Sequence, residues 1–291
     1  MNGVLVVDKP RGWTSHDVVQ KVRGLLKEKK IGHTGTLDPL ATGVLVLCAG
    51  KATKIIRYLE NDEKIYTAEM VLGSTTDTLD AEGRIVEKRA YTAPTRQQVQ
   101  EVLMRFRGTI LQRPPAYSAL KVGGVPSHRL ARAGKIITHE ERPITIWELD
   151  LLEYTDPVIR IRVRCSKGTY IRTLCADIGQ HLGMGAHLTS LLRNSVGHFA
   201  LGSAHSIAEV TAAGTRSGLL VSMRDALGAF PETLVSASDA RRLGEGGTVV
   251  LPPESSIPDG VTHVRVSESS TGLVAVARVE EGTLRPETVL L

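Results

Sequence analysis

A short polar loop at residues 32–43, GHTGTLDPLATG, carries the side chain best suited to chemistry. Its one carboxylate, Asp38, lies among glycines and threonines directly before Pro39. An Asp-Pro pair is more often a turn or a cap than a catalyst. Here few other charges compete within the loop, an apolar run from Val44 to Leu47 follows it, and the flanking sequence is basic. A carboxylate acting on a nucleic acid needs such a rigid, basic setting, so Asp38 is the candidate catalytic group.

Two neighbouring motifs suggest other chemistry but have the wrong spacing. GVLVLCAGKATK resembles a phosphate-binding loop, but six residues separate its glycines and Ala52 follows its lysine. A P-loop needs four residues there, and Ser or Thr after the lysine. TTDTLDAEG suggests a calcium loop with Asp77, Asp80 and Glu82, but it lacks oxygen ligands at alternate positions. We interpret the second motif as a solvated turn.

The cysteines and histidines do not predict a metal site or a disulfide framework. Cys48, Cys165 and Cys175 are odd in number and widely spaced, without a CxxC motif. Cys175, His181 and His187 are six residues apart, which matches no zinc-ligand spacing. We therefore expect small buried cysteines in a reducing compartment, and no metal.

Length and composition predict an ordinary folded protein. The chain has 291 residues, of which 42% are hydrophobic and 23% charged. This length allows one large domain with a smaller one. No apolar run reaches the roughly 18 to 20 residues of a membrane span, and MNGVLVVDKPRG lacks the long apolar stretch of a signal peptide. We expect a soluble, cytoplasmic protein that does not bind membranes.

Basic charge is concentrated in two stretches of the chain. Residues 1–57 hold ten Lys or Arg against four acids, and residues 100–142 hold eight against three. Residues 230–291 are acidic, with nine acids against five basic residues. The two basic stretches could form a surface for a polyanion, although the overall charge of +5 is also compatible with an ordinary solvated surface.

Hydrophobic periodicity predicts a mixed α and β protein. The pattern indicates a helix after an N-cap at Ser15, a helix over 95–106 and a helix from Ile171 to Leu182. Strands are expected in the opening GVLVVDK and over 44–47, 63–72 and 158–165, and a further helix over 51–60. In 158–165 the apolar residues alternate with Arg160, Arg162 and Arg164. The Pro- and Gly-rich residues 108–126 predict a long exposed loop, which we interpret as a mobile clamp.

Five segments together closely resemble the TruB family of tRNA pseudouridine-55 synthases. They are VVDKPRGWTSHDVV, GHTGTLDPLATGVLVL, KIYTAEMVLG, RPPAYSALKVGG and CSKGTYIRTLCADIG, in order within about residues 3–200. The resemblance implies an α+β pseudouridine-synthase fold with a mixed, largely antiparallel sheet. It also implies an enzyme that isomerises uridine 55 in the T loop of tRNA.

The resemblance assigns roles residue by residue. Asp38 falls on the catalytic aspartate, and Arg172 on its ion partner in the TYIR motif. Tyr66 falls on the tyrosine that packs on the target base, and the resemblance makes both Tyr66 and Arg172 catalytic-site residues. The expected substrate-binding residues, besides Tyr66, are His33, Tyr170 and Leu191, with Leu192 an alternative to Leu191.

The reaction breaks the bond from C1′ to N1 of uracil and rejoins C1′ to C5. Because nothing is oxidised or hydrolysed overall, we expect no cofactor. Asp38 could attack C1′, add to C6 or remove a sugar proton, and these alternatives stay open. The target base must be flipped out of the folded RNA to reach a buried carboxylate. A non-catalytic tRNA-binding or tRNA-folding protein is the alternative function.

The remaining expectations concern partners and domains. We expect tRNA, through its T arm, as the partner of a monomeric enzyme. RNA phosphates should contact the basic residues of the predicted loop and its flank, Arg113, Lys121, Arg129 and Arg132. We expect a catalytic domain over 1–229 and a small β-rich PUA-like RNA-binding domain over 230–291. The latter would bind RNA through a few arginines such as Arg241 and Arg242, or be mainly structural.

Overall fold

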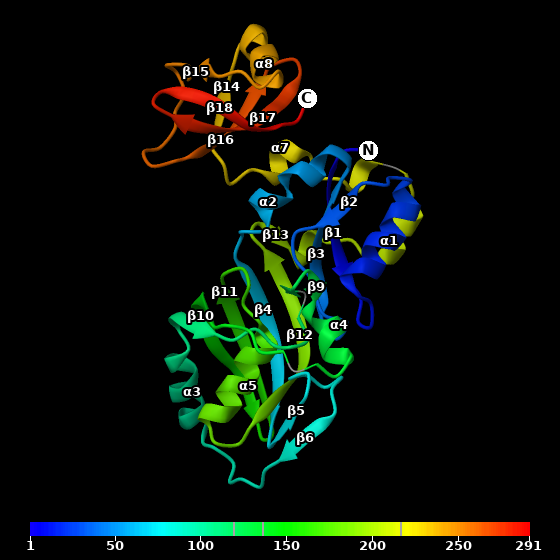
Figure 1. Ribbon diagram of the computed structural model, residues 1–291, viewed down its shortest axis with the longest axis vertical. Helices are drawn as coiled ribbons and strands as arrows, with labels where there is room; N and C mark the ends of the chain where they lie inside the picture. The colour runs from blue at the N-terminus through cyan, green and yellow to red at the C-terminus, as the bar shows by residue number, and fades with distance from the viewer. Residues whose placement is uncertain (119, 136, 216) are drawn as a thin grey trace.

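The protein folds into a large mixed sheet with a smaller sheet at one end (Figure 1). The computed structural model describes residues 1–118, 120–135, 137–215 and 217–291, and the side chains of 126, 128, 132 and 217 lie outside this description. The nine-stranded sheet has the order β1-β3-β12-β4-β11-β10-β7, with β2 beside β3 and β13 beside β12. Within the described strands, β3 and β12 are parallel and the other neighbours are antiparallel. The expected mixed, largely antiparallel sheet is confirmed.

The strands of the large sheet come from the first 200 residues of the chain. They are β1 (Gly3–Lys9), β2 (Ile31–His33), β3 (Thr42–Ala49), β4 (Lys64–Leu72), β7 (Gly108–Gln112), β10 (Arg142–Thr155), β11 (Val158–Cys165), β12 (Ala186–Val196) and β13 (Phe199–Ala200). Two short hairpins lie outside it, β5 (Ser74–Thr76) with β6 (Ile85–Lys88) and β8 (Lys121–Val122) with β9 (Val125–Pro126). The large sheet therefore brings together β4 and β12, which are far apart in the sequence.

Helices cover the large sheet in two separate groups. Helices α3 (Arg96–Arg105) and α5 (Ile171–His181) pack on β10, β11, β4 and β12, where a buried cluster includes Tyr66, Leu191 and Ile161. Helices α1 (Ser15–Leu26) and α6 (Ile207–Ala213) pack on β1 and β3 through a second cluster. The short helices are η1 (Gly50–Ile55), α2 (Ile56–Leu59), α4 (Ser127–Arg132), η2 (Leu201–Ser203), η3 (Ser217–Leu219) and α7 (Met223–Ala226). None of the described helices is long and apolar enough to cross a membrane.

Most of the expected elements are present, but two expectations are wrong. Thr14, not Ser15, caps α1, since the Thr14 hydroxyl accepts the Asp17 amide and the Asp17 carboxylate accepts the Thr14 amide. Residues 108–126 are not one exposed loop, because 108–112 form β7 at the edge of the sheet, paired with β10. The glycine at the start of this edge strand and the prolines after its end give the sequence the appearance of a loop. The alternation in 158–165 is confirmed, with Ile159, Ile161, Val163 and Cys165 all buried.

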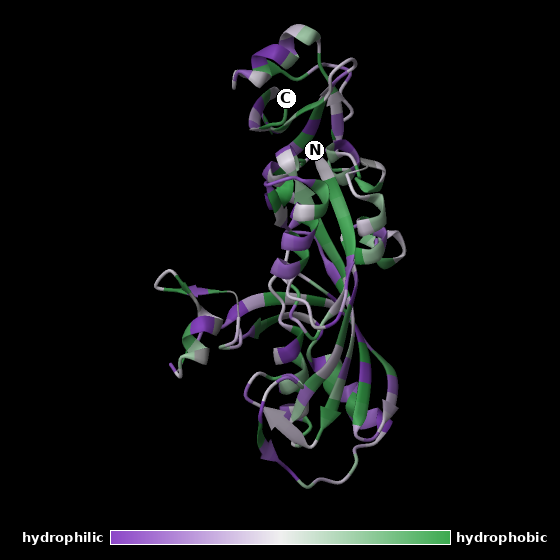
Figure 2. Cartoon of the chain, turned by 90° about the vertical axis from the view of Figure 1, so that its right-hand side faces the viewer, coloured by the Kyte–Doolittle hydropathy of each residue, from purple (hydrophilic) through white to green (hydrophobic). Residues whose placement is uncertain are grey.

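The rest of the expected loop belongs to a projecting segment. Residues 113–141, called the arm from here on, connect β7 to β10 and contain the β8–β9 hairpin and α4. Figure 2 shows this segment standing out from the body of the protein. Arg113 and Glu141 form an ion pair of 3.2 Å between its two ends. The arm is thus closed at its base and extended beyond it.

The smaller sheet shares a hydrophobic cluster with the large one. It has the order β14-β16-β17-β18-β15, with α8 (Ala237–Gly244) packed against it. Its strands are β14 (Glu232–Leu234), β15 (Val249–Val250), β16 (His263–Glu268), β17 (Gly272–Glu280) and β18 (Thr283–Val289). Val276 and Leu290 belong to the same buried cluster as Val4, and the Tyr58 hydroxyl is 2.9 Å from that of Thr288. The two sheets are therefore joined by a shared core and by polar contacts.

A buried lysine fixes the connection that follows β1. Lys9 is inaccessible to solvent, and its ammonium donates to the carbonyls of Pro10, Trp13 and Pro39 at 3.0, 2.6 and 3.4 Å. An ammonium has three protons to donate, and all three carbonyls can be satisfied together. Burial lowers the pKa of Lys9 to about 8, so the charged form still predominates at neutral pH. Lys9 thereby ties β1 and the start of α1 to the segment after Asp38.

Replacing Lys9 by methionine should lower the free energy of unfolding by about 1 to 3 kcal/mol, because buried carbonyls lose their donor. Urea unfolding followed by circular dichroism measures the change. The control is Lys21→Met, since Lys21 is exposed on α1 and should change stability by less than about 0.5 kcal/mol. Equal, small effects of the two substitutions would show that the Lys9 contacts do not stabilise the fold.

Candidate active site

The loop that carries Asp38 is held at several points by the body of the protein. The Asp38 carbonyl accepts the Ala41 amide at 3.1 Å, which closes a turn with Pro39 in its second position. Before the turn, the Ser15 hydroxyl donates to the Leu37 carbonyl and accepts the Leu37 amide, at 3.1 and 2.8 Å. Ser15 therefore anchors the loop to α1 instead of capping the helix.

Arg193 of β12 holds the opposite end of this loop. Its guanidinium is buried and donates to the carbonyls of Val44, Thr36 and Gly35 at 2.7, 3.4 and 3.2 Å. Gly43 permits this arrangement, because a Cβ on its backbone (φ +98°) would lie 2.3 Å from the Arg193 carbonyl oxygen. The parallel contact between β3 and β12 thus fixes the loop relative to the sheet.

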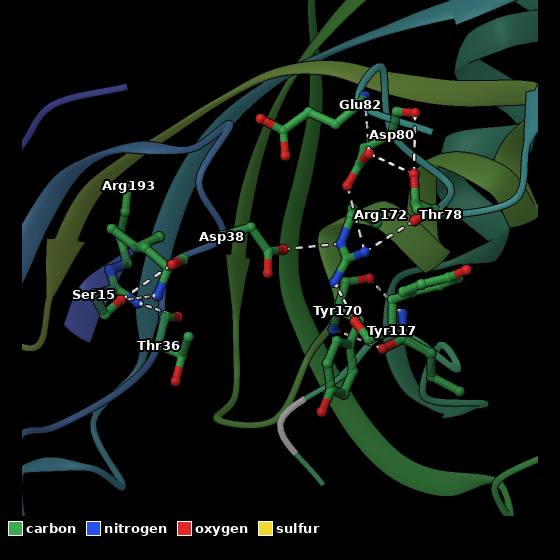
Figure 3. Close-up of polar contacts among 12 residues, drawn as sticks. Ser15, Thr36, Asp38, Thr78, Asp80, Glu82, Tyr117, Tyr170, Arg172 and Arg193 are labelled. Atoms are coloured by element: carbon green, nitrogen blue, oxygen red, sulfur yellow. Dashed lines mark hydrogen bonds and ion pairs between the residues drawn. The ribbon is translucent and has the colours of Figure 1, made fainter. Parts of the chain in front are cut away.

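Asp38 and Arg172 form the ion pair at the centre of the site (Figure 3). The Arg172 Nε lies 2.9 Å from the Asp38 Oδ2. Arg172, the second residue of α5, has a side chain only 6% exposed, whereas that of Asp38 is 37% exposed. The carboxylate is accordingly accessible from outside while its cationic partner is buried beneath it. Figure 3 shows the second Asp38 oxygen pointing away from Arg172.

The other guanidinium nitrogens of Arg172 contact two further segments. Nη1 donates to the Thr78 carbonyl at 2.9 Å and lies 3.4 Å from the Asp80 Oδ2. Nη2 donates to the Tyr117 carbonyl at 2.8 Å, which belongs to the arm. A buried guanidinium with this many acceptors is held in one orientation. Its Nε–H is therefore directed at Asp38.

The surroundings of Asp38 have opposing effects on its proton affinity. Burial raises the pKa of Asp38 above its ordinary value, and the nearby Asp80 carboxylate adds to the rise. The Arg172 charge and hydrogen bond lower that pKa again, as does the charge of Lys9, but burial is the largest effect. Perturbation of this kind is frequent at catalytic groups.

Tyr66 and Leu191 lie on adjacent strands in one buried cluster with Leu37 of the Asp38 loop. Leu191 is 7% exposed and pairs with Ala68, two residues beyond Tyr66. The neighbouring Leu192 is not part of this cluster, so Leu191 is the better candidate for a pocket wall. Burial raises the pKa of Tyr66, whereas a hydrogen bond with Arg193 opposes the rise.

Tyr170 and His33 come from the two segments that carry Arg172 and Asp38, respectively. Tyr170 precedes α5, and both of its backbone groups bond to the Gln112 side chain, at 2.8 and 3.1 Å. Burial raises the pKa of Tyr170, and the charge of Asp38 adds to the rise. His33 ends β2, where burial and the Arg193 charge lower its pKa, so its imidazole is neutral at pH 7. Within the described chain, the buried His33 Nδ1 has no hydrogen-bond partner.

The expected RNA-binding residues are spread over the arm rather than gathered at Asp38. Arg113 is at its base in the ion pair with Glu141, and Lys121 and Arg129 are exposed on β8 and α4. The side chain of Arg132 lies outside the described residues. The arm reaches the site through its backbone, at the Tyr117 carbonyl.

The sequence analysis missed Asp80 and Arg193. The interpretation of TTDTLDAEG as a solvated turn is wrong for Asp80, which is 4% exposed and accepts bonds from the Thr78 hydroxyl and Glu82 amide at 2.6 and 3.1 Å. The available signal for Arg193 was a charged residue directly after the apolar pair Leu191 and Leu192. Among the described residues, no group of three or more His, Cys, Asp or Glu side chains could hold a metal ion.

Comparison with known proteins places this site in a family. A family described as TruB family pseudouridylate synthase (N terminal domain) matches residues 23–171, and tRNA pseudouridylate synthase B C-terminal domain matches residues 172–222. The chain belongs to the TruB family. The first match contains Asp38, Tyr66, Asp80 and the arm, and the second contains Arg172.

Several relatives carry the name tRNA pseudouridine synthase B. The protein of Syntrophotalea carbinolica is 46% identical over 259 residues, 88% of this chain and 83% of the relative. That of Dehalococcoides mccartyi strain BAV1 is 40% identical over 295 residues, which cover 100% of this chain and 97% of the relative. That of Pseudomonas aeruginosa strain UCBPP-PA14 is 52% identical over 204 residues, which cover 70% of this chain and 67% of the relative. Membership of the TruB family therefore extends over the full chain.

Solved structures share the fold. A chain in the crystal structure of a Cbf5-Nop10-Gar1 complex is 25% identical with a TM-score of 0.77, covering 99% of this chain and 85% of that one. A chain of the archaeal box H/ACA sRNP Nop10-Cbf5 complex is 23% identical, with a TM-score of 0.75 and coverage of 99% and 86%. The α+β pseudouridine-synthase fold expected from the sequence is thus confirmed.

Replacing Arg172 by glutamine should raise the pKa of Asp38, because the cation that favours the carboxylate is lost. A reaction that needs ionised Asp38 slows as the pH falls through that pKa, so the acid limb of single-turnover rate against pH should move to higher pH. Arg172→Lys should restore the position of the limb better than the maximal rate, because lysine cannot reproduce the planar contacts.

An unchanged limb in Arg172→Gln, with the rate lowered equally at every pH, would mean that Arg172 does not control Asp38 ionisation. Thermal unfolding of both variants is the control, since removing the cation leaves buried carboxylates without their partner.

Proposed function

We propose that this protein isomerises a uridine in the T loop of tRNA, uridine 55, to pseudouridine, with Asp38 as the catalytic carboxylate. The observation that carries the proposal is the accessible Asp38 held by the buried Arg172, on a loop fixed from three elements. Membership of the TruB family and the name shared by the relatives support the same reaction.

The proposed reaction exchanges one bond to C1′ of the ribose for another. The C1′–N1 bond breaks, the uracil turns, and C1′ bonds to C5. The proton on C5 is then lost and N1 gains one, so the product is an isomer of the substrate. The proposed role of Asp38 is to attack C1′, to add to C6 or to remove a sugar proton, and each route needs the carboxylate ionised. Arg172 keeps Asp38 oriented and lowers its pKa against the effect of burial.

We assign the walls of the uracil pocket to Tyr66 and Leu191, from β4 and β12. The aromatic ring of Tyr66 offers a stacking surface for the flipped base, and Leu191 excludes water from the detached uracil. Because burial raises the pKa of Tyr66, its hydroxyl is protonated at neutral pH in the free enzyme. In the role of proton carrier, Tyr66 would give its own proton to N1 and take the proton from C5, with the Arg193 charge and hydrogen bond stabilising the phenolate in between. Tyr170 and the neutral His33 are proposed to contact the RNA beside the pocket.

Incubation with an unmodified tRNA transcript, without ATP, tests the reaction directly. Pseudouridine should appear at one T-loop position, and none should form in a transcript with cytidine there. Asp38→Asn removes the charge but keeps the size, so tRNA affinity should stay within about threefold while turnover disappears. Binding without product from the wild-type protein would favour the alternative, a tRNA-binding or tRNA-folding protein. Measurable single-turnover conversion by Asp38→Asn would overturn the role of this carboxylate.

We further propose that the arm grips RNA phosphates through Lys121 and Arg129, together with Arg113 at its base and Arg132. Both Lys121 and Arg129 are exposed on a segment that projects from the body (Figure 2). Sequence-specific recognition of RNA favours splayed loops over regular helix, which suits a T-arm substrate. The arm would then act as a clamp over the bound loop.

The double variant Lys121→Gln/Arg129→Gln should weaken tRNA binding and flatten its dependence on salt. Each lost phosphate contact removes up to about 0.9 from the slope of log affinity against log salt on duplex, or about 0.7 on single strands. Filter binding at several salt concentrations gives the slope. Arg96→Gln/Arg105→Gln on α3 is the matched control, because both arginines are exposed on a different element. Equal slopes for the two double variants would show that Lys121 and Arg129 are ordinary surface charges that do not contact RNA phosphates.

We propose the remaining assignments from composition and fold. A catalytic domain over 1–229 and a PUA-like RNA-binding domain over 230–291 agree with the smaller sheet, whose first strand begins at Glu232. Arg241 and Arg242 are exposed on α8 and are the proposed RNA contacts of that domain. We propose a monomer acting in the cytoplasm, where tRNA is modified.

A further inference from the structure

A buried polar cluster lies at the base of the arm. Ser118, Ser127 and His139 are all nearly inaccessible to solvent, although the arm projects from the body. The His139 Nε2 lies 2.9 Å from the Ser127 Oγ and 3.4 Å from the Ser118 Oγ. These residues are separated in sequence by the β8–β9 hairpin and α4. His139 therefore joins the segment before the hairpin to the start of α4.

The hydrogen bonds of Ser127 fix the direction of the contact with His139. The Ser127 hydroxyl donates to the Ala116 carbonyl at 2.7 Å, and it has a single proton. Its oxygen must consequently accept from His139, which places a proton on Nε2. The Ser127 amide also donates to the Leu120 carbonyl at 2.6 Å. Ser127 is thus bonded on both sides of the short segment that contains Tyr117 and Ser118, beside the active site.

Tyr117 and Ser118 contact two residues of the TYIR motif, Arg172 and Tyr170. The Tyr117 carbonyl accepts the Arg172 Nη2, and the Ser118 hydroxyl hydrogen-bonds the Tyr170 side chain. Figure 3 shows Tyr117 and Tyr170 together beside Arg172. This short segment therefore contacts His139 through Ser118 and the guanidinium that orients Asp38 through Tyr117.

We infer that His139 is a positioning residue for the reaction at Asp38: it fastens the base of the arm against Tyr170 and Arg172. The inference rests on the proposed function. RNA bound by Lys121 and Arg129 pulls on the chain between Ser118 and Ser127, and the hydrogen bonds of His139 hold the two ends of this segment together. While these hydrogen bonds are intact, the Tyr117 carbonyl stays bonded to Arg172 when the arm holds RNA. Without them, the arm still binds phosphate, but Arg172 loses a fixed acceptor and Asp38 its fixed orientation.

Two substitutions of His139 separate this role from simple packing. A glutamine amide can place an N–H near the position of Nε2, whereas the shorter asparagine reaches only the position of Nδ1. His139→Asn should therefore lower the single-turnover rate at saturating T-arm stem-loop about tenfold, and His139→Gln should stay within about threefold of wild type. The Kd of both variants should stay within about threefold, since the basic side chains of the arm are unchanged. His198→Asn, at an exposed histidine, is the control and should behave as wild type.

The outcomes distinguish the inference from the proposed function. Wild-type protein that forms no pseudouridine refutes the function itself. An active wild type with Asn and Gln variants of equal rate, or with the loss confined to Kd, overturns the role of His139. Should His139→Asn not fold, Ser118→Ala breaks the link to Tyr170 and must show the same loss of rate at unchanged Kd. A wild-type rate for Ser118→Ala would overturn the inference as well.

Discussion

The burial of the Arg172 guanidinium is the constraint on which the site depends. A buried cation without partners is strongly destabilising, so the surrounding chain must supply acceptors in fixed places. They come from the Asp38 loop, the turn at 78–80 and the arm, three segments that are distant in sequence. The candidate catalytic carboxylate is thereby oriented by an interaction that the fold requires. Of the two carboxylates that contact Arg172, Asp38 is the more exposed to solvent.

Lys9 and Arg193 are also buried cations that need acceptors in fixed places, and their acceptors are backbone carbonyls. Each places a buried cation among carbonyl oxygens, and together they hold the chain on both sides of Asp38. Part of the basic charge counted upstream in the sequence is thus internal. Lys9 serves the fold, so the surface offered to a polyanion is smaller than the count for residues 1–57 implies. Lys121 and Arg129 of the arm are, by contrast, exposed to solvent.

Structural features that depend on a local sequence pattern were predicted from the sequence. Features that depend on the register between distant strands or on distant partners were not. Periodicity was sufficient for β11 and α5, and the family resemblance was sufficient for the pairing of Asp38 with Arg172. Asp80 could not be recognised, because its burial arises from a partner 92 positions along the chain. Arg193 was hidden by a bulge between Leu188 and Ser190, which shifts the alternation of β12 and turns the arginine inward. The boundary between β7 and the arm was not predicted, because β7 has the amino-acid composition of a loop.

The hydrophobic cluster shared by the two sheets also bears on how the protein is made. It contains Val4 from the first strand and Leu290 from the segment after the last strand. Synthesis proceeds from the N-terminus, so β1 and β3 can pair early while their outer face still lacks part of its covering. Contacts of such large sequence separation form slowly. During translation, the face around Val4 and Tyr58 therefore stays incompletely covered until Val276 and Leu290 join it.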